Sequence, residues 1–164
     1  MQTTPKNFYN IFAAAVLSAL LSMNTSALAA GSSSVDVPKS QSGSDLREKA
    51  NVHFQKGKAY EDQQRFKEAT QEYEKAIDID NGYAEAYSNL GFSYRKQGRH
   101  DDAIRAYKRA IDLKPGLAEA HEYLGEAYAE TKQFSLAEKH LDILKRLDPD
   151  EAKELEAFIQ KMKR

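Results

Sequence analysis

The sequence contains no cysteine among its 164 residues, and its formal net charge is only −1. Without cysteine, the chain has no disulfide, no thiolate metal site, no cysteine nucleophile and no lipid-modified cysteine near its N-terminus. A nearly balanced charge gives no overall attraction to nucleic acid or to an anionic membrane. Charged residues make up 30% of the chain and apolar residues 41%, and this balance and length suit one soluble domain.

Long apolar runs are also scarce, and the one that occurs lies near the N-terminus. Lys6 precedes the run Ile11–Leu21, and Ala27-Leu28-Ala29 follows it. A charged start, a short apolar run and small residues in an A-x-A pattern are typical of a secretory signal peptide. We therefore expect residues 1–29 to be removed and the mature chain to be exported, most naturally to a bacterial periplasm, without stable membrane insertion. The alternative is an uncleaved anchor, although the run is short for a hydrocarbon core of about 30 Å.

Residues 30–44 are rich in serine and glycine and contain a single proline, Pro38. Such a composition cannot bury enough apolar surface to offset the entropy lost on ordering. We therefore expect a flexible linker here, followed by a folded domain that comprises residues 45–164.

From Ala50 onward the sequence repeats with a period of 34 residues. The segments 50–83, 84–117 and 118–151 align without any insertion. Several residues recur at the same place in all three segments, namely Ala50/Ala84/Ala118, Gly57/Gly91/Gly125, Tyr60/Tyr94/Tyr128 and Ala69/Ala103/Ala137. A period of this size indicates stacked supersecondary units.

Each repeat divides into two helical halves. In the middle repeat, apolar residues recur at helical spacing up to Tyr94, Gln97-Gly98-Arg99 interrupts the pattern, and a second stripe ends near Pro115. Ser135 and Glu138 predict a capping box at one helix start, and Asp148 before Pro149 predicts a capped start for the last helix. This last helix, at about 150–163, has one apolar face and is expected to cap the third repeat.

The pattern resembles the tetratricopeptide repeat family, whose unit carries aromatic-x2-Leu-Gly-x2-Tyr followed by Ala, an aromatic residue, Ala and Pro. The middle repeat has all of these residues: Tyr87, Leu90, Gly91, Tyr94, Ala103, Tyr107, Ala110 and Pro115. The first repeat departs from the pattern at Lys56 and Asn81, and the third has Leu141 and Leu144 in place of an aromatic residue and an alanine. The resemblance implies an all-α fold, an α-solenoid of three helix-turn-helix units with a C-terminal capping helix.

The resemblance also implies that the first helix of each unit lines a concave groove that binds another protein. Groove-facing positions then form the candidate partner-binding site, which consists of Phe54, Gln55, Lys58, Ser88, Asn89, Phe92, Arg95, Glu119, Glu122, Tyr123 and Glu126.

Two features of these positions predict the chemistry of a ligand. Phe54, Phe92 and Tyr123 give each repeat one aromatic residue, and aromatic residues are frequent binding hot spots; Phe92 has the alternative of packing against the neighbouring repeat. Glutamates dominate the groove positions of the third repeat, which suits a ligand with basic and apolar residues.

One sub-class of the family grips a partner's terminal carboxylate with lysine, asparagine and arginine. At those positions this sequence has Phe54, Lys58, Asn89, Glu119 and Tyr123, and only Asn89 matches. Acidic and aromatic residues where cations are required argue against an anionic C-terminal tail as the ligand.

No combination of residues predicts catalysis, a metal site or a cofactor. The four histidines form no i,i+4 pair of the kind found in helical zinc sites. His53 and His121 occupy the position of Tyr87 in the middle repeat and are expected to pack. The basic residues of the second helix of repeat two alternate with Asp101 and Asp102, which indicates a solvated face rather than a nucleic-acid site.

We therefore expect a non-enzymatic scaffold that binds a peptide or helix of another envelope protein and binds no nucleic acid. Two alternatives remain open at this stage. One is a structural protein that forms a homo-oligomer through its exposed end faces. The other is a docking subunit of an envelope enzyme complex in which a partner performs the chemistry.

Overall fold

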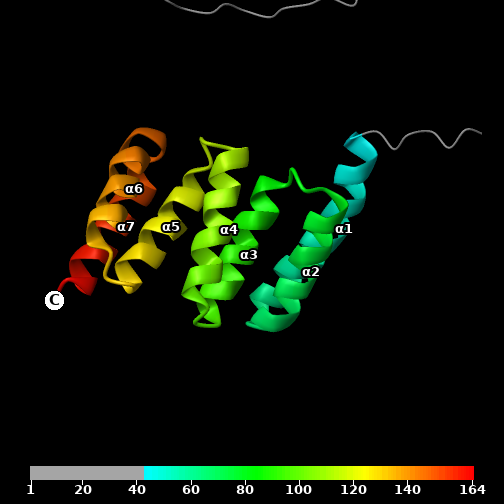
Figure 1. Ribbon diagram of the computed structural model, residues 1–164, viewed down its shortest axis with the longest axis horizontal. Coiled ribbons are helices and arrows are strands. Elements are labelled where there is room, and N and C mark those ends of the chain that lie inside the picture. The colour runs from blue at the N-terminus through cyan, green and yellow to red at the C-terminus, as the bar shows by residue number, and fades with distance from the viewer. Residues whose placement is uncertain (1–42) are drawn as a thin grey trace, which may run out of the picture. The chain divides into compact units, whose positions relative to one another are not determined.

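The computed structural model describes residues 43–164, which are entirely helical apart from short turns (Figure 1). In chain order the helices are α1 (Gly43–Asp62), α2 (Phe66–Ile79), α3 (Ala84–Lys96), α4 (His100–Leu113), α5 (Ala118–Glu130), α6 (Phe134–Leu147) and α7 (Pro149–Met162). The predicted all-α class is therefore confirmed. The predicted signal peptide lies outside the described residues, as does the predicted linker except for Gly43 and Ser44, which are the first residues of α1.

The helices pack as three antiparallel pairs that follow one another, α1 with α2, α3 with α4 and α5 with α6, and α7 then packs on both α5 and α6. The second and third pairs each lie within one 34-residue segment of the sequence repeat, whereas α1 of the first pair begins before Ala50, at Gly43. The fold is thus a short α-solenoid in which each unit contacts its neighbours in sequence.

The same turn joins the two helices of every pair. Gln64, Gly98 and Lys132 occupy equivalent positions and have φ angles of 59°, 75° and 60°. In the middle unit the amide of Arg99 donates to the carbonyl of Tyr94 at 2.9 Å, and the other two turns repeat this bond. A left-handed residue with such a bond is the Schellman motif, which ends a helix and favours glycine. Only the middle turn has glycine at this position.

The two helices of a pair touch where a glycine faces an aromatic ring. A Cβ atom placed on Gly91 would lie 2.7 Å from the ring carbons Cδ1 and Cε1 of Tyr107, which is fully buried. Gly57 faces Tyr73 in the same way at 2.5 Å. The recurrent glycines therefore serve close helix packing, which explains why they are kept inside helices that they would otherwise weaken.

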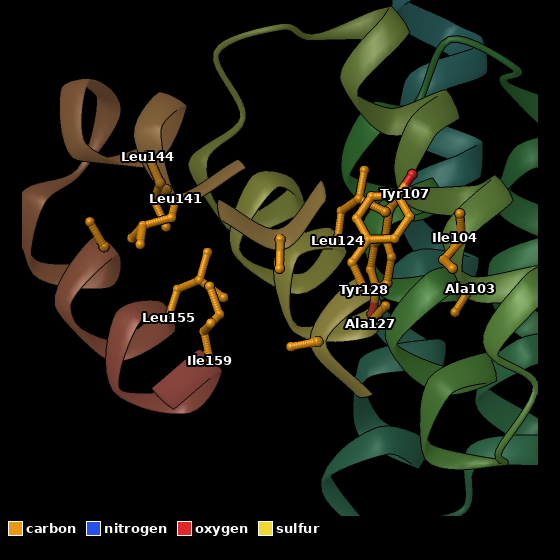
Figure 2. Close-up of a cluster of buried hydrophobic side chains, with 13 residues drawn as sticks. Ala103, Ile104, Tyr107, Leu124, Ala127, Tyr128, Leu141, Leu144, Leu155 and Ile159 are labelled. Atoms are coloured by element: carbon orange, nitrogen blue, oxygen red, sulfur yellow. The ribbon is translucent and has the colours of Figure 1, made fainter. Parts of the chain in front are cut away.

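In the third pair this contact is made by different residues, because Leu141 occupies the position at which the other pairs have tyrosine. Here a Cβ atom on Gly125 would lie 2.6 Å from Cδ2 of Leu155, a residue of α7. Leu155 and Ile159 join Leu141 and Leu144 in one buried cluster (Figure 2). The last helix thus fills the space above α5 and completes the core, as expected of a cap.

Of the two predicted helix starts, one is confirmed and one is wrong. The Asp148 side chain accepts hydrogen bonds from the amides of Asp150 and Glu151 at 3.0 and 3.2 Å, and Pro149 is the first residue of α7. By contrast, α6 begins at Phe134 without a side-chain cap. Ser135 therefore lies within the helix and forms no capping box, because the preceding turn places the helix start two residues earlier, with Gln133 at the N-cap.

The glycine–tyrosine contact generates a stability prediction. We expect Gly91→Ala to lower the free energy of unfolding by about 1–2 kcal/mol, because overpacking against the immobile Tyr107 ring outweighs the gain of about 1 kcal/mol in helix propensity. Thermal unfolding followed by circular dichroism measures this. Gly43→Ala is the control, because no atom lies within 4 Å of the added methyl group. An unchanged or higher midpoint for Gly91→Ala would contradict the prediction.

Candidate functional site

Helices α1, α3, α5 and α7 form an inner layer of the stack. α1 contacts α3, α3 contacts α5 and α5 contacts α7, whereas within residues 43–164 the helices α2, α4 and α6 do not contact one another. Because the inner helices are closer together than the outer ones, the stack is hollowed on the side of the inner layer. We call the accessible side of these four helices the inner surface.

The structure divides the predicted groove residues into two groups. One group is exposed or half-buried and belongs to the inner surface: Gln55, Lys58, Phe92, Glu119, Glu122, Tyr123 and Glu126. The other group is buried: Phe54, Ser88, Asn89 and Arg95.

Phe54, Ser88 and Asn89 belong to the packing between units and are not available to a ligand. The ring centroid of Phe54 lies 4.9 Å from that of Tyr83 and 5.8 Å from that of Tyr73. Ser88 is fully buried, and the Asn89 side-chain amide donates to the Tyr73 hydroxyl at 3.4 Å. Their assignment to the groove is corrected, because neighbouring helices cover these side chains.

Arg95 is buried for a different reason, since it connects α3 to α5. Its Nη2 lies 2.6 Å from Oε2 of Glu126 and its Nη1 2.8 Å from Oε1 of Glu130, and its side chain is 7% exposed. Its guanidinium carbon also lies 5.6 Å from the ring centroid of Phe92 and 5.9 Å from that of Tyr123. Arg95 therefore positions two carboxylates and two rings of the inner surface, and its own charge is neutralised.

A cleft of about 460 Å³ opens beside the Phe92 ring and is lined by Glu61, Asp62, Gln64, Phe66, Phe92 and Lys96. Phe66 and Phe92 supply its apolar part and meet edge to face with centroids 6.3 Å apart. The Phe92 ring continues to Tyr123, whose centroid is 5.3 Å away. Phe66 is not among the predicted groove residues, because it is the first residue of α2 and the resemblance assigns second helices to the outer side.

Next to these rings, α5 and α7 carry carboxylates that have no cation within ion-pair distance among the described residues. Within the described part of the chain, Glu119, Glu122, Glu151 and Glu154 form no ion pair, whereas Glu126 and Glu130 of the same α5 are both paired with Arg95. Burial and the charges of Glu126, Glu151, Glu154 and Glu119 raise the pKa of Glu122 to about 7. Glu151 and Glu154 are not among the predicted groove residues, because they lie on α7 and approach Glu122 only through the packing of this helix.

Burial also raises the pKa of the neighbouring carboxyls of Glu61, Glu119, Glu126 and Glu151. For Glu126 the Arg95 guanidinium counteracts this increase, and for Glu119 the Lys58 ammonium does so. Partly desolvated carboxylates of this kind attract a cation more strongly than fully solvated ones do.

Two of the histidines, His121 and His140, lie apart from this surface and pack against each other, whereas His53 lies 2.7 Å from Glu72 and His100 lies 3.4 Å from Glu130. Nε2 of His121 lies 3.0 Å from the carbonyl of Pro115, which can only accept, so this nitrogen carries the proton. Nδ1 of His121 then accepts from Nδ1 of His140 at 3.0 Å, and burial lowers the pKa of His140 to about 4. Among residues 43–164 no three acidic or histidine side chains are grouped as metal ligands. No helix in this part of the chain is long and apolar enough to cross a membrane.

Comparison with known proteins relates this architecture to a family of helical repeats. The family profile described as tetratricopeptide repeat matches residues 84–117, and a second profile, described as TPR repeat, matches residues 57–98. A comparison with curated protein sequences returned no match.

Several solved structures are similar. The first TPR of Spaghetti (RPAP3), solved with the HSP90 peptide SRMEEVD, has 25% identity and a TM-score of 0.66, with 72% of this chain and 96% of that chain covered. The Arabidopsis OM64 TPR domain shares the fold, with 20% identity, a TM-score of 0.67 and 71% and 98% covered. MamA has 31% identity and a TM-score of 0.55, with 70% of this chain covered, and this chain spans 61% of the MamA chain.

The raised pKa of Glu122 predicts how stability depends on pH. Between pH of about 4.5 and about 7, the Glu122 carboxyl is still protonated in the folded chain but ionised in the unfolded chain. The free energy of unfolding therefore falls as the pH rises through that range. Glu122→Gln removes the effect. We expect the variant to gain thermal stability relative to the original chain at pH 8 and to gain less at pH 5.

The control is Asp112→Asn, which makes the same charge change at an exposed position of the outer helix α4. Thermal unfolding of the three proteins at both pH values measures the difference. An equal shift of Glu122→Gln at pH 5 and pH 8 would show that Glu122 titrates as an ordinary carboxyl.

Proposed function

The chain is a tetratricopeptide repeat protein, and from that premise we propose that its inner surface holds a peptide or helix of another protein of the bacterial envelope. Proteins built from such repeats act as interaction scaffolds, and the proposed role is non-catalytic. The protein would stabilise or assemble a complex by presenting this surface to a partner. The observation that carries the proposal is the cleft at Phe66 and Phe92 together with the half-buried carboxylates beside it.

A domain of similar architecture supports a peptide as the ligand. The Spaghetti repeat domain, of which this chain covers 96%, is bound to a seven-residue peptide, SRMEEVD. An array of three helix pairs is therefore large enough to hold a short segment of another protein. A cleft with aromatic walls and charged rims is also the usual form of a binding site.

The envelope setting rests on the N-terminal sequence alone. The short apolar run and Ala27-Leu28-Ala29 support export and cleavage after Ala29. We expect the chain to be found in the periplasmic fraction of the bacterium that produces it, with an intact mass that begins at Ala30. A mass that includes residues 1–29 would favour the membrane anchor over the cleaved signal peptide.

The binding surface can be tested by crosslinking from defined positions. A photoreactive amino acid at Lys96, on the rim of the cleft, is expected to form an adduct with another protein in intact cells. The same amino acid at Asp112, exposed on α4, is the control for the outer side. Adducts of equal yield from both positions would overturn the assignment to the inner surface, and an adduct with a second copy of the chain would favour self-association.

Phe92→Ala adds an energetic test of the same surface. Truncating an aromatic hot spot costs about 2 kcal/mol or more of binding free energy, which corresponds to about thirtyfold weaker binding. We therefore expect the adduct from Lys96 to fall strongly in this variant, while circular dichroism shows that the helices remain. An undiminished adduct would exclude the cleft as the main contact.

A further inference from the structure

We infer that the segment held by the inner surface is cationic, with an apolar side chain for the Phe66–Phe92 cleft and lysine or arginine residues for the carboxylates of α5 and α7. This inference rests on the proposed function and adds the chemical class of the partner. Three observations support it: the inner surface has few accessible cations, several of its carboxylates form no ion pair, and the apolar cleft lies beside these carboxylates.

The inner surface has few cations that can meet a ligand. Arg95 is 7% exposed at its side chain and already holds Glu126 and Glu130, so it is not available to an anionic group. Lys96 Nζ lies 4.9 Å from the ring centroid of Phe92, at the rim of the cleft. Lys58 is exposed on α1 and acts on Glu119 and Glu61. An acidic segment would therefore find no cluster of cations here.

The carboxylates, by contrast, are in excess. Glu119, Glu122, Glu151 and Glu154 have no ion-pair partner in the described part of the chain. Oε2 of Glu151 is also shielded from solvent without a hydrogen-bond partner. On the outer side, by contrast, Glu68 and Glu72 of α2 have cationic partners, since Glu68 pairs with Arg65 at 2.9 Å and Glu72 with Lys75 at 2.5 Å. A ligand that brings cations would supply the partners that the chain itself does not provide.

The pKa of Glu122 agrees with this deficit of positive charge. Burial and four neighbouring glutamates, Glu126, Glu151, Glu154 and Glu119, raise this pKa to about 7. A lysine or arginine placed among these groups would stabilise their ionised forms. Binding of a cationic segment is therefore expected to weaken as the pH falls from 8 to 5.5.

The apolar cleft and the carboxylates belong to one continuous surface. Phe92 borders the cleft and its ring lies 5.3 Å from that of Tyr123, which is next to Glu122 in sequence on α5. A segment that crosses the inner helices from α1 towards α7 therefore meets aromatic rings first and carboxylates second. An acidic segment such as SRMEEVD would place like charges together, which disfavours its binding.

A second copy of this chain is the competing cationic occupant. The outer helix α4 exposes Arg105, Lys108 and Arg109. Arg105 is, however, paired with Asp102, and the large apolar side chains next to these residues in α4, Ile104 and Tyr107, are buried and cannot enter the cleft of another copy. A peptide segment with both features therefore fits the surface better, and self-association becomes an outcome of the test.

The experiment uses the full chain and fluorescein-labelled peptides in anisotropy titrations. The first probe has twelve residues with one phenylalanine followed by alternating lysine and serine, the second has glutamate in place of every lysine, and the third is SRMEEVD. We expect the lysine probe to bind at least about tenfold more tightly than either acidic probe, because several charge-assisted contacts are gained or lost together. The advantage should shrink between 50 and 200 mM salt.

Two triple variants with the same change in net charge locate the contact. Glu119→Gln, Glu122→Gln and Glu154→Gln together are expected to weaken the lysine probe by about tenfold or more. Asp78→Asn, Asp101→Asn and Asp112→Asn together change exposed residues of the outer helices α2 and α4 and are expected to have less than about a twofold effect. Equal weakening by both triple variants would show that the lysine probe responds only to the net charge of the protein, and this result would overturn the inference.

The remaining outcomes separate this inference from the proposed function. If an acidic probe binds as tightly as the lysine probe and Phe92→Ala still weakens it, the surface binds peptides but the charge class is wrong. If Phe92→Ala affects no probe, binding lies elsewhere and the proposed surface falls as well. If no probe binds, the inference that the ligand is cationic is overturned. If light scattering shows a dimer, and the dimer is disrupted by Arg105→Ser, Lys108→Ser and Arg109→Ser together, the surface binds a second copy of the chain.

Discussion

The close approach of paired helices at Gly57 and Gly91 is the contact on which the rest of the structure depends. Because these residues have no side chain, the rings of Tyr73 and Tyr107 lie directly against the preceding helix and become fully buried. Because of this contact, one side of α1 and of α3 is buried against the second helix of its own pair. The opposite side of these helices is left for neighbouring units and for solvent, and the inner surface is formed there.

The inner surface is held in place by the same residues that join the units. Arg95 connects α3 to two carboxylates of α5 and lies close to the rings of Phe92 and Tyr123. A buried ion pair of this kind is costly to break, because removal of one partner leaves uncompensated charge. The aromatic and acidic parts of the surface therefore keep a fixed relation to each other, which favours a ligand that matches both at once.

The capping helix contributes to the surface as well as to stability. Leu155 covers Gly125 where the third repeat lacks a tyrosine, and this packing brings Glu151 and Glu154 towards Glu122. The excess of negative charge on the inner surface thus arises partly from a helix that lies beyond the repeats. Repeat arrays need such a terminal helix to cover their last apolar face, and in this chain the cap also sets the electrostatic character of the surface.

The sequence by itself determined the helix pairs, their order, the turn at Gly98 and the cap at Asp148, because these features depend on residues close together in the chain and recur every 34 residues. It also indicated the acidic character of the third repeat. Only the tertiary structure decided that Phe54, Ser88 and Asn89 are buried, that Arg95 is neutralised, and that Phe66, Glu151 and Glu154 adjoin the surface. The physical reason is that accessibility and charge balance depend on side chains from neighbouring units, which the periodicity of one helix does not contain.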